Sequence, residues 1–324
     1  MKAVVFDGAV KFVNDYPVPE PGKQEALIRV SMAGICNTDI EITKGYLGFH
    51  GVMGHEFVGI VEYAPEYAAG LINKRVVGEI NCGCGNCDYC TAGMGKHCPS
   101  RTTLGIQGRN GVFAEYTVLP VANLHVVPDT VSDEEAIFVE PLAAAYEIQE
   151  QIEIKPAHTI LVLGDGKLGL LCALALNLSG TQVTLAGKHE KKLHVAEKEH
   201  IRIVNLKAEK QDTDKKYDIV VEATGSQEGF TSAIGNVKPR GTIVLKSTIS
   251  SSQQINLASI VVDEITVIGS RCGPFEPAIG ALAEKRINVK PLISGVYPVK
   301  DAQKAFEEAR NKENLKVIID FRSG

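Results

Sequence analysis

The sequence predicts an α/β protein in which an irregular β-barrel domain precedes a doubly wound parallel sheet. Short Val-, Gly- and Pro-rich runs separated by turns fill residues 1 to about 130, and from about residue 145 six apolar runs alternate with helical stretches. A glycine-rich turn joins the first of these six runs to an Ala- and Leu-rich helix. The 324 residues are enough for two domains, and the net charge of −5 gives no case for binding nucleic acid or an anionic membrane.

Four runs in the first part have the composition of β-strands, and the chain begins with one of them rather than with a signal peptide. These runs are 4–6, 25–30, 57–61 and 113–118. The longest apolar stretch, around 168–178, is too short to cross a bilayer and is predicted to be a buried helix. We therefore expect a cytoplasmic protein with no membrane partner.

The six later strands are predicted at 159–163, 182–186, 201–205, 218–223, 241–246 and 265–270. Strands that alternate with helices fit an open parallel sheet covered on both faces. The last residues of the chain, including a predicted helix at 300–310, do not extend this alternation and are expected to return to the first domain. The predicted domains are therefore 1–145 with 275–324, and 146–274.

A cluster of cysteines is the most specific metal signal. Cys84, Cys87, Cys90 and Cys98 follow the spacing C-x2-C-x2-C-x7-C. Four thiolates at this spacing can close a tetrahedral zinc site with no open position, which is a structural arrangement. Cys82 is a near neighbour, and we prefer Cys84 because the two x2 spacings then run evenly. The alternative is a group of free thiols.

A second candidate metal site is dispersed along the chain. Cys36 follows a predicted strand, His55 and Glu56 come about twenty residues later, and Glu140 opens the link to the second domain. A thiolate, an imidazole and a carboxylate can bind zinc and leave a fourth position for water or substrate, as catalytic sites do. Each of these residues could also have an ordinary structural role, so their spacing alone does not establish a metal site.

The glycine-rich turn is Gly164-Asp165-Gly166-Lys167-Leu168-Gly169. It lies between a predicted strand and a predicted helix, which is the pattern of a dinucleotide-binding Rossmann unit. Its glycines permit the sharp turn, the approach of a pyrophosphate to the backbone and close packing of the helix. Thr224, directly after the strand predicted at 218–223, is a further cofactor-binding candidate. An ordinary strand–turn–helix connection is the alternative.

The end of the strand at 182–186 bears on which dinucleotide is bound. An acidic residue there would hydrogen-bond the ribose 2′-hydroxyl of NAD, whereas basic residues suit the 2′-phosphate of NADP. Gly187 stands there without a carboxylate, and Lys188 and His189 follow at once. This pattern favours NADP over NAD, although arginine is the usual partner of the phosphate.

Together these motifs resemble the zinc-dependent medium-chain alcohol and polyol dehydrogenases. The resemblance runs from residue 1 to about 320 and rests on several independent motifs: 34–39, 54–59, the four-cysteine lobe, 140–143 and the turn at 164–169. It implies a GroES-like catalytic domain made from the N-terminal part and the C-terminal segment, with a Rossmann domain inserted between them. The form of 140–143, Glu-Pro-Leu-Ala, is similar to that of sorbitol and archaeal glucose dehydrogenases.

The resemblance also implies roles for particular residues. Cys36, His55 and Glu140 look like the catalytic zinc ligands, and Glu56 looks like the carboxylate that enters the metal shell during exchange. Thr38 matches the hydroxyl that relays the substrate proton towards the cofactor ribose.

Three carboxylates complete the assignment by resemblance. Asp39 matches the group that holds the other nitrogen of the histidine ligand. Glu41 and Glu115 are candidate contacts to sugar hydroxyls, and both have the alternative of being solvated carboxylates. Asn37 stands where the family usually has glycine, which puts the substrate in doubt but not the chemistry.

The resemblance implies reversible oxidation of an alcohol with zinc and NADP or NAD as cofactors, in a homodimer or homotetramer. A zinc-free quinone or enone reductase of the same superfamily is one alternative, but it needs neither metal site. A non-catalytic nucleotide-binding redox sensor is another, and the presence of Thr38, Asp39 and Glu56 around the proposed ligands argues against it because a sensor needs no proton relay. A zinc protein that binds nucleic acid is the least favoured, because no basic stripe accompanies the cysteines.

Overall fold

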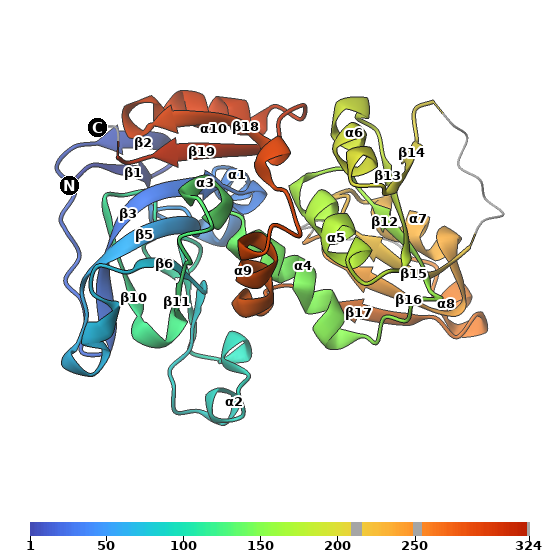
Figure 1. Ribbon diagram of the computed structural model, residues 1–324, viewed down its shortest axis with the longest axis horizontal. Coiled ribbons are helices and arrows are strands. Elements are labelled where there is room, and N and C mark those ends of the chain that lie inside the picture. The colour runs from blue at the N-terminus through green and yellow to red at the C-terminus, as the bar shows by residue number, and fades with distance from the viewer. Residues whose placement is uncertain (209–215, 249–254, 323–324) are drawn as a thin grey trace. The chain divides into compact units, whose positions relative to one another are not determined.

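The computed structural model of the chain describes residues 1–208, 216–248 and 255–322 (Figure 1). The chain divides into two units, Met1–Glu140 with Ile279–Gly324, and Pro141–Ala278. Helices α4 (Val139–Gln151) and α9 (Phe275–Ala283) contain the two boundaries. None of the helices in the described ranges combines the length and apolarity that crossing a bilayer requires.

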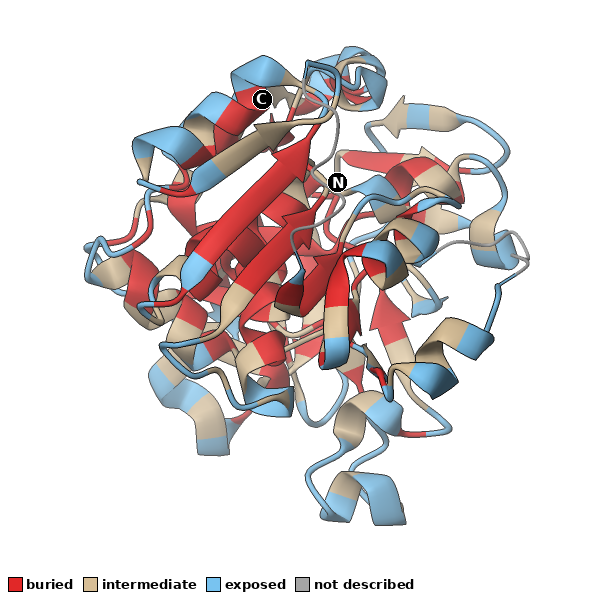
Figure 2. Cartoon of the chain, turned by 90° about the vertical axis from the view of Figure 1, so that its right-hand side faces the viewer, coloured by how far each residue is buried: buried red, intermediate tan, exposed pale blue. Residues whose placement is uncertain are grey.

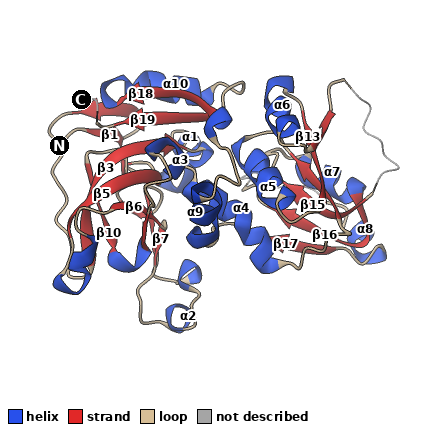
Figure 3. Cartoon of the chain, in the orientation of Figure 1, coloured by secondary structure: helices blue, strands red, loops and turns tan. Residues whose placement is uncertain are grey.

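The first unit is built mostly of strands (Figure 3). Its strands are β1 (Ala3–Phe6), β2 (Val10–Val13), β3 (Glu25–Ile35), β4 (Gly51–Val52), β5 (Glu56–Tyr63), β6 (Arg75–Gly78), β7 (Asn81–Cys82), β8 (Thr102–Leu104), β9 (Gly108–Arg109), β10 (Tyr116–Pro120), β11 (Leu124–Val126), β18 (Ile293–Pro298) and β19 (Lys316–Asp320). Its α-helices are α1 (Asn37–Ile42), α2 (Asp88–Thr91), α3 (Asp133–Ala136) and α10 (Ala302–Arg310).

The long strand β3 organises this unit. It pairs with β5 along most of its length, with β10 near its start and with β19 near its end, within a sheet ordered β11-β6-β5-β3-β19-β18. Its last residues are continuously buried, and β5 and β19 pair with this part of the strand on its two edges. This pairing brings the C-terminal strand β19 beside residues near position 35.

One predicted strand of this unit begins later than expected. The expected strand 113–118 begins at Tyr116 and continues to Pro120. The N–H groups of Val112 and Phe113 donate to the carbonyl oxygens of Gly54 and Met53, and the carbonyl oxygen of Phe113 accepts the N–H of Val4 on β1. Residues 113–115 therefore lie outside β10, and Ala114 forms only an isolated antiparallel bridge with Ala3 of β1.

The second unit alternates strands and helices as predicted. Its elements are β12 (Thr159–Leu163), α5 (Lys167–Asn177), β13 (Gln182–Gly187), α6 (Glu190–Lys198), β14 (Arg202–Asn205), β15 (Tyr217–Glu222), α7 (Gly229–Asn236), β16 (Val237–Leu245), α8 (Ala258–Val262) and β17 (Thr266–Gly269). The strands form one parallel sheet ordered β14-β13-β12-β15-β16-β17. All six predicted strands are present, and β16 begins four residues earlier than expected because Val237 already pairs with Tyr217.

The strand order reverses between β12 and β15. Because crossovers between parallel strands are right-handed, α5 and α6 cover one face of the sheet and α7 the other. The central strands β12 and β15 are buried between these layers, and the helix predicted from the apolar stretch is the buried α5. In such sheets ligands bind at the carboxyl ends of the strands, at the point of reversal.

Candidate active site and cofactor site

Local backbone structure places Cys36 at the end of β3. Cys36 has extended dihedral angles and is the N-cap of α1. Oδ2 of Asp39 accepts a hydrogen bond from its backbone N–H at 2.8 Å. Thr38 lies in the same turn, with its hydroxyl oxygen 3.8 Å from Sγ of Cys36. The strand end and the first helical turn therefore fix the thiol and the hydroxyl together.

His55 is held by the loop between β4 and β5. Gly54 before it has a φ of +92°, and a Cβ there would lie 2.5 Å from the ring of Phe113. Gly105 and Gly111 pack so closely that a Cβ on either would lie 2.2 Å from the carbonyl oxygen of Gly54. This tight backbone packing leaves the imidazole little freedom, and His55 is only 3% exposed.

Asp39 connects the two residues. Its Oδ1 lies 3.4 Å from Nδ1 of His55. The angles of this contact do not meet those of a hydrogen bond, so each of these two buried atoms has no hydrogen-bond partner. Burial lowers the pKa of His55, but the Asp39 carboxylate and the Cys36 thiolate raise the pKa to well above its ordinary value. The same negative field favours a divalent cation at the opposite ring nitrogen, Nε2.

Among the described residues, two groups of side chains could each hold a metal ion, and one of them is Cys36, His55 and Glu56. One ligand atom from each lies within 4.8 Å of the others. Soft sulfur, imidazole nitrogen and carboxylate oxygen form a donor set that suits zinc. The group does not include Glu140, which is half-buried in the first turn of α4.

Lys316 is a member of this centre that the sequence reasoning missed. Its Nζ forms an ion pair with Oε2 of Glu56, and each side chain is only 1% exposed. Gly34 makes room for the pair, because a Cβ there would lie 2.6 Å from Oε2 of Glu56. A lysine that opens an apolar strand, Lys316-Val317-Ile318-Ile319, was the available signal, although such a lysine is ordinarily solvated.

The two predicted substrate contacts, Glu41 and Glu115, lie in different surroundings. Glu41 is on α1 near Cys36, and its carboxylate forms an ion pair with the exposed Lys44 at 2.8 Å. Glu115 precedes β10, and its Oε2 accepts a hydrogen bond from the backbone N–H of Lys2 at 2.6 Å. Glu115 is thus used to hold the start of the chain, and no contact links it to Cys36 or His55.

The second possible metal group is the four-cysteine lobe, made of Cys84, Cys87, Cys90 and Cys98. It lies between β7 and β8, contains the short helix α2, and is mostly exposed apart from the buried Cys98 (Figure 2). Sγ of Cys87 lies 3.7 Å from Sγ of Cys98. The N–H groups of Asn86 and Cys87 hold the pKa of Cys84 at about 6, so this thiol is readily available as a thiolate ligand.

The glycine turn lies at the carboxyl end of β12, next to the reversal of strand order. Gly164 has a φ of +111°, and a Cβ on Gly169 would lie 1.9 Å from the carbonyl oxygen of Gly164. A Cβ on Gly166 would meet nothing within 4 Å, which leaves open space over the start of α5. Lys167 and Leu168 begin that helix. This geometry fits a pyrophosphate on the helix N-terminus.

The other candidate cofactor residues lie at the ends of the neighbouring strands. Lys188 is exposed after β13, and His189 is the N-cap of α6. Thr224 follows β15, where its hydroxyl donates to Oε1 of Glu222 at 2.6 Å. The neighbouring residue, Ala223, packs against Gly164. The predicted cofactor residues therefore lie together at the carboxyl ends of the adjacent strands β12, β13 and β15.

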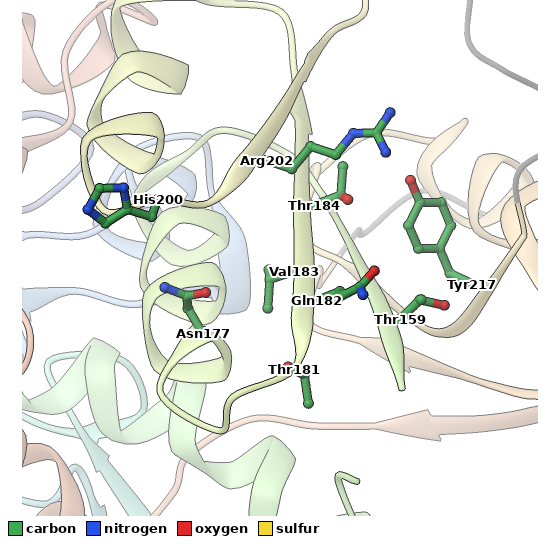
Figure 4. A pocket seen from close by; sticks show the side chains of 9 residues that line it. All are labelled: Thr159, Asn177, Thr181, Gln182, Val183, Thr184, His200, Arg202 and Tyr217. Atoms are coloured by element: carbon green, nitrogen blue, oxygen red, sulfur yellow. The ribbon is translucent and has the colours of Figure 1, made fainter. Parts of the chain in front are cut away.

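A hollow of about 300 Å³ opens at the opposite, amino-terminal edge of the same sheet (Figure 4). It is therefore separate from the glycine turn. Its lining is mainly polar and consists of Thr159, Asn177, Thr181, Gln182, Val183, Thr184, His200, Arg202 and Tyr217.

Two protein families match the chain. The alcohol dehydrogenase GroES-like domain family matches residues 22–129, and the glucose dehydrogenase C-terminus family matches residues 134–321. A sorbitol dehydrogenase of Halalkalibacterium halodurans is 29% identical, over 95% of this chain and 94% of that protein.

Two solved structures are similar over nearly the whole chain. One is described as a zinc-binding dehydrogenase from Sinorhizobium meliloti 1021 bound to NADP, with a TM-score of 0.90, 28% identity and 98% of each chain covered. The other is the alcohol dehydrogenase TADH from Thermus sp. ATN1, with a TM-score of 0.92, 27% identity and 99% and 100% of the chains covered. The chain belongs to the zinc-containing medium-chain alcohol and polyol dehydrogenases, and it is an NAD(P)-dependent oxidoreductase of that family.

Proposed function

We propose that this enzyme reversibly oxidises a polyol, a sugar or another secondary alcohol to the corresponding carbonyl compound, at a zinc ion held by Cys36 and His55. The observation that carries the proposal is the group of the half-buried Cys36 with the buried His55 and Glu56, in which Asp39 contacts both Cys36 and His55. Glu140 remains the predicted third ligand from family resemblance, and Glu56 is the carboxylate already beside the other two. The similarity to a sorbitol dehydrogenase supports a polyol-like substrate.

The cofactors supply the parts of the reaction that amino acids cannot: zinc acts as a Lewis acid towards the alcohol oxygen, and NAD(P) accepts the hydride. The protein's residues position the reactants and move the proton. The Asp39 carboxylate faces Nδ1 of His55 at 3.4 Å, which favours coordination through the other ring nitrogen. The hydroxyl of Thr38, close to Cys36, accepts the substrate proton and passes it outwards.

We infer that the four-cysteine lobe binds a second, structural zinc ion. The lobe has few apolar side chains and little buried surface, so packing alone gives it little stability. Four thiolates occupy all positions of a tetrahedral ion and leave none for a substrate. This zinc would therefore hold the loop between β7 and β8 and take no part in the reaction.

The edge of the parallel sheet supports assembly into a homodimer or homotetramer. β17 is the last strand of the sheet, and its outer edge has N–H and C=O groups available for pairing with another strand. In the helix before it, Val261 and Val262 are 75% and 79% exposed. Light scattering of the purified protein would test this, and a monomeric mass would reject it. A cytoplasmic location remains a prediction.

The direct test is a screen of polyols, sugars and secondary alcohols with NAD and with NADP, in which the absorbance of the reduced nicotinamide is followed. We expect reduction that depends on the alcohol and is abolished when a chelator removes the metal. Reduction of quinones or enones that persists without zinc would instead support the zinc-free reductase. Binding of a dinucleotide with no turnover of any substrate would support the redox sensor.

A further inference from the structure

The side chain of Asp165, in the glycine turn, fills the space that a side chain at position 187 would need. Gly187 ends β13, where NAD-binding Rossmann units have the acidic residue that hydrogen-bonds the adenosine ribose. A Cβ added to Gly187 would lie 2.4 Å from both Cβ and Oδ2 of Asp165. Residue 187 must therefore remain glycine while residue 165 is aspartate, and a carboxylate nevertheless stands at the end of β13.

Hydrogen bonds fix this carboxylate. Oδ2 of Asp165 accepts the backbone N–H groups of Lys188 and His189, both at 2.6 Å. Nδ1 of His189 lies 3.0 Å from Oδ1. Burial raises the pKa of Asp165, but the hydrogen bonds from the ring and backbone of His189 and from Lys188 outweigh burial and hold the pKa below its ordinary value. Asp165 is therefore ionised at neutral pH.

The same contacts weaken the case for a 2′-phosphate. The sequence favours NADP because Lys188 and His189 are basic, but the ring of His189 faces the Asp165 carboxylate, so any positive charge on it is already balanced. A 2′-phosphate would bring further negative charge close to the ionised carboxylate, and like charges are unfavourable at that range. The exposed Lys188 would oppose this repulsion.

We infer that Asp165 is the residue that determines dinucleotide specificity, a carboxylate supplied by the glycine turn instead of by the end of β13, and that it selects NAD over NADP. A carboxylate oxygen has two lone pairs, so Oδ1 can accept the ribose 2′-hydroxyl in addition to its contact with His189. The inference rests on the proposed function only in requiring that the glycine turn binds a dinucleotide.

The test is to titrate the full-length protein with NADH and with NADPH and to measure each dissociation constant by nicotinamide fluorescence. We expect the wild type to bind NADH about tenfold tighter or more, since a hydrogen bond to a charged group contributes about that factor. Asp165→Asn should reduce this ratio about tenfold. The double variant D165G/G187D moves the carboxylate back to the end of β13 and should restore the preference for NADH.

Asp218→Asn is the matched control, because it removes another well-bonded carboxylate at the opposite edge of the same sheet and should leave the ratio unchanged. The inference is overturned if wild-type protein prefers NADPH, if neither dinucleotide binds, or if D165N weakens both equally as a purely structural residue would. The measurement needs no alcohol, so tight binding of NADH without turnover would count against the proposed function and not against this inference.

Discussion

At the scale of single residues, Asp39 is the link between chemistry and fold. One of its oxygens accepts the backbone N–H of Cys36 and the other faces Nδ1 of His55. Cys36 and His55 are nineteen positions apart in sequence, yet a single buried carboxylate contacts both residues. This arrangement explains why the two side chains can be pre-positioned for a metal without any ligand to gather them.

Replacing Cys36 or His55 by Ala should abolish turnover, about a thousandfold or more, because Lewis-acid catalysis contributes several kcal/mol. Dinucleotide binding should be largely retained, since the glycine turn belongs to the other unit. Steady-state kinetics measures the first effect and NADH titration the second. A variant with full activity would reject the metal assignment, and circular dichroism of each variant controls for misfolding.

The buried pair of Lys316 and Glu56 predicts a large effect on stability. Lys316→Met leaves the Glu56 carboxylate buried without its counter-charge, which should reduce the free energy of unfolding by about 3–5 kcal/mol. The ammonium also lies 5.7 Å from the ring centroid of Phe138, so its loss removes a second favourable contact. Denaturant titration measures the change.

The double variant K316M/E56Q is the control for that prediction. It removes both charges and should recover most of the lost stability, because an apolar side chain beside a neutral amide costs far less than an isolated charge. Equal stabilities of K316M and the wild type would show that the pair does not stabilise the native fold.

At the scale of elements, the parallel sheet was far easier to predict than the barrel. Its strands are buried on both faces and give continuous apolar runs such as 159–163, and glycines mark its first turn. Strands of the first unit as short as Gly51–Val52 and Gly108–Arg109 give no periodic pattern, and their pairing depends on distant partners. Residues 113–115 are strand-like in composition, yet they form only an isolated bridge to β1 before β10 begins.

Asp218, on β15, links its strand to the two neighbouring strands of the parallel sheet through side-chain bonds. It accepts hydrogen bonds from the backbone N–H and the hydroxyl of Thr159 on β12, and it pairs with Lys238 on β16 at 2.9 Å. Although burial raises the pKa of Asp218, the bonds from Lys238 and Thr159 hold the pKa at about 2. The charged form is therefore the one that the folded sheet stabilises.

Asp218→Asn should accordingly lower stability in a manner that depends on pH. Because the folded pKa lies below the unfolded value of 3.8, the carboxylate stabilises the fold above pH 3.8, and this contribution is lost as the pH falls towards 2. We expect a deficit of about 1–2 kcal/mol at pH 7 after allowance for partial solvent screening. Denaturation curves at several pH values measure it. A deficit of constant size at all pH values would contradict this account.

At the scale of the whole molecule, residues far apart in sequence meet because β3 lies between β5 and β19. Motif spacing and family resemblance predicted Cys36, Thr38, Asp39, His55 and Glu56, since each sits within a short recognisable run. Lys316 could not be found in this way, because its role depends on an ion pair with Glu56, which lies 260 residues away in sequence. Asp165 was predicted as a cofactor residue, but its position beside Gly187 becomes visible only in three dimensions.

The zinc content of the purified full-length chain tests the central claim most directly. The two groups of possible ligands predict two zinc ions per chain, measured by inductively coupled plasma mass spectrometry. His55→Ala and Cys90→Ser should each lose one ion, and only the first should also lose turnover with a competent alcohol. A wild-type chain with a single ion that is kept in H55A and lost in C90S would contradict the claim, because only the cysteine lobe would then bind metal.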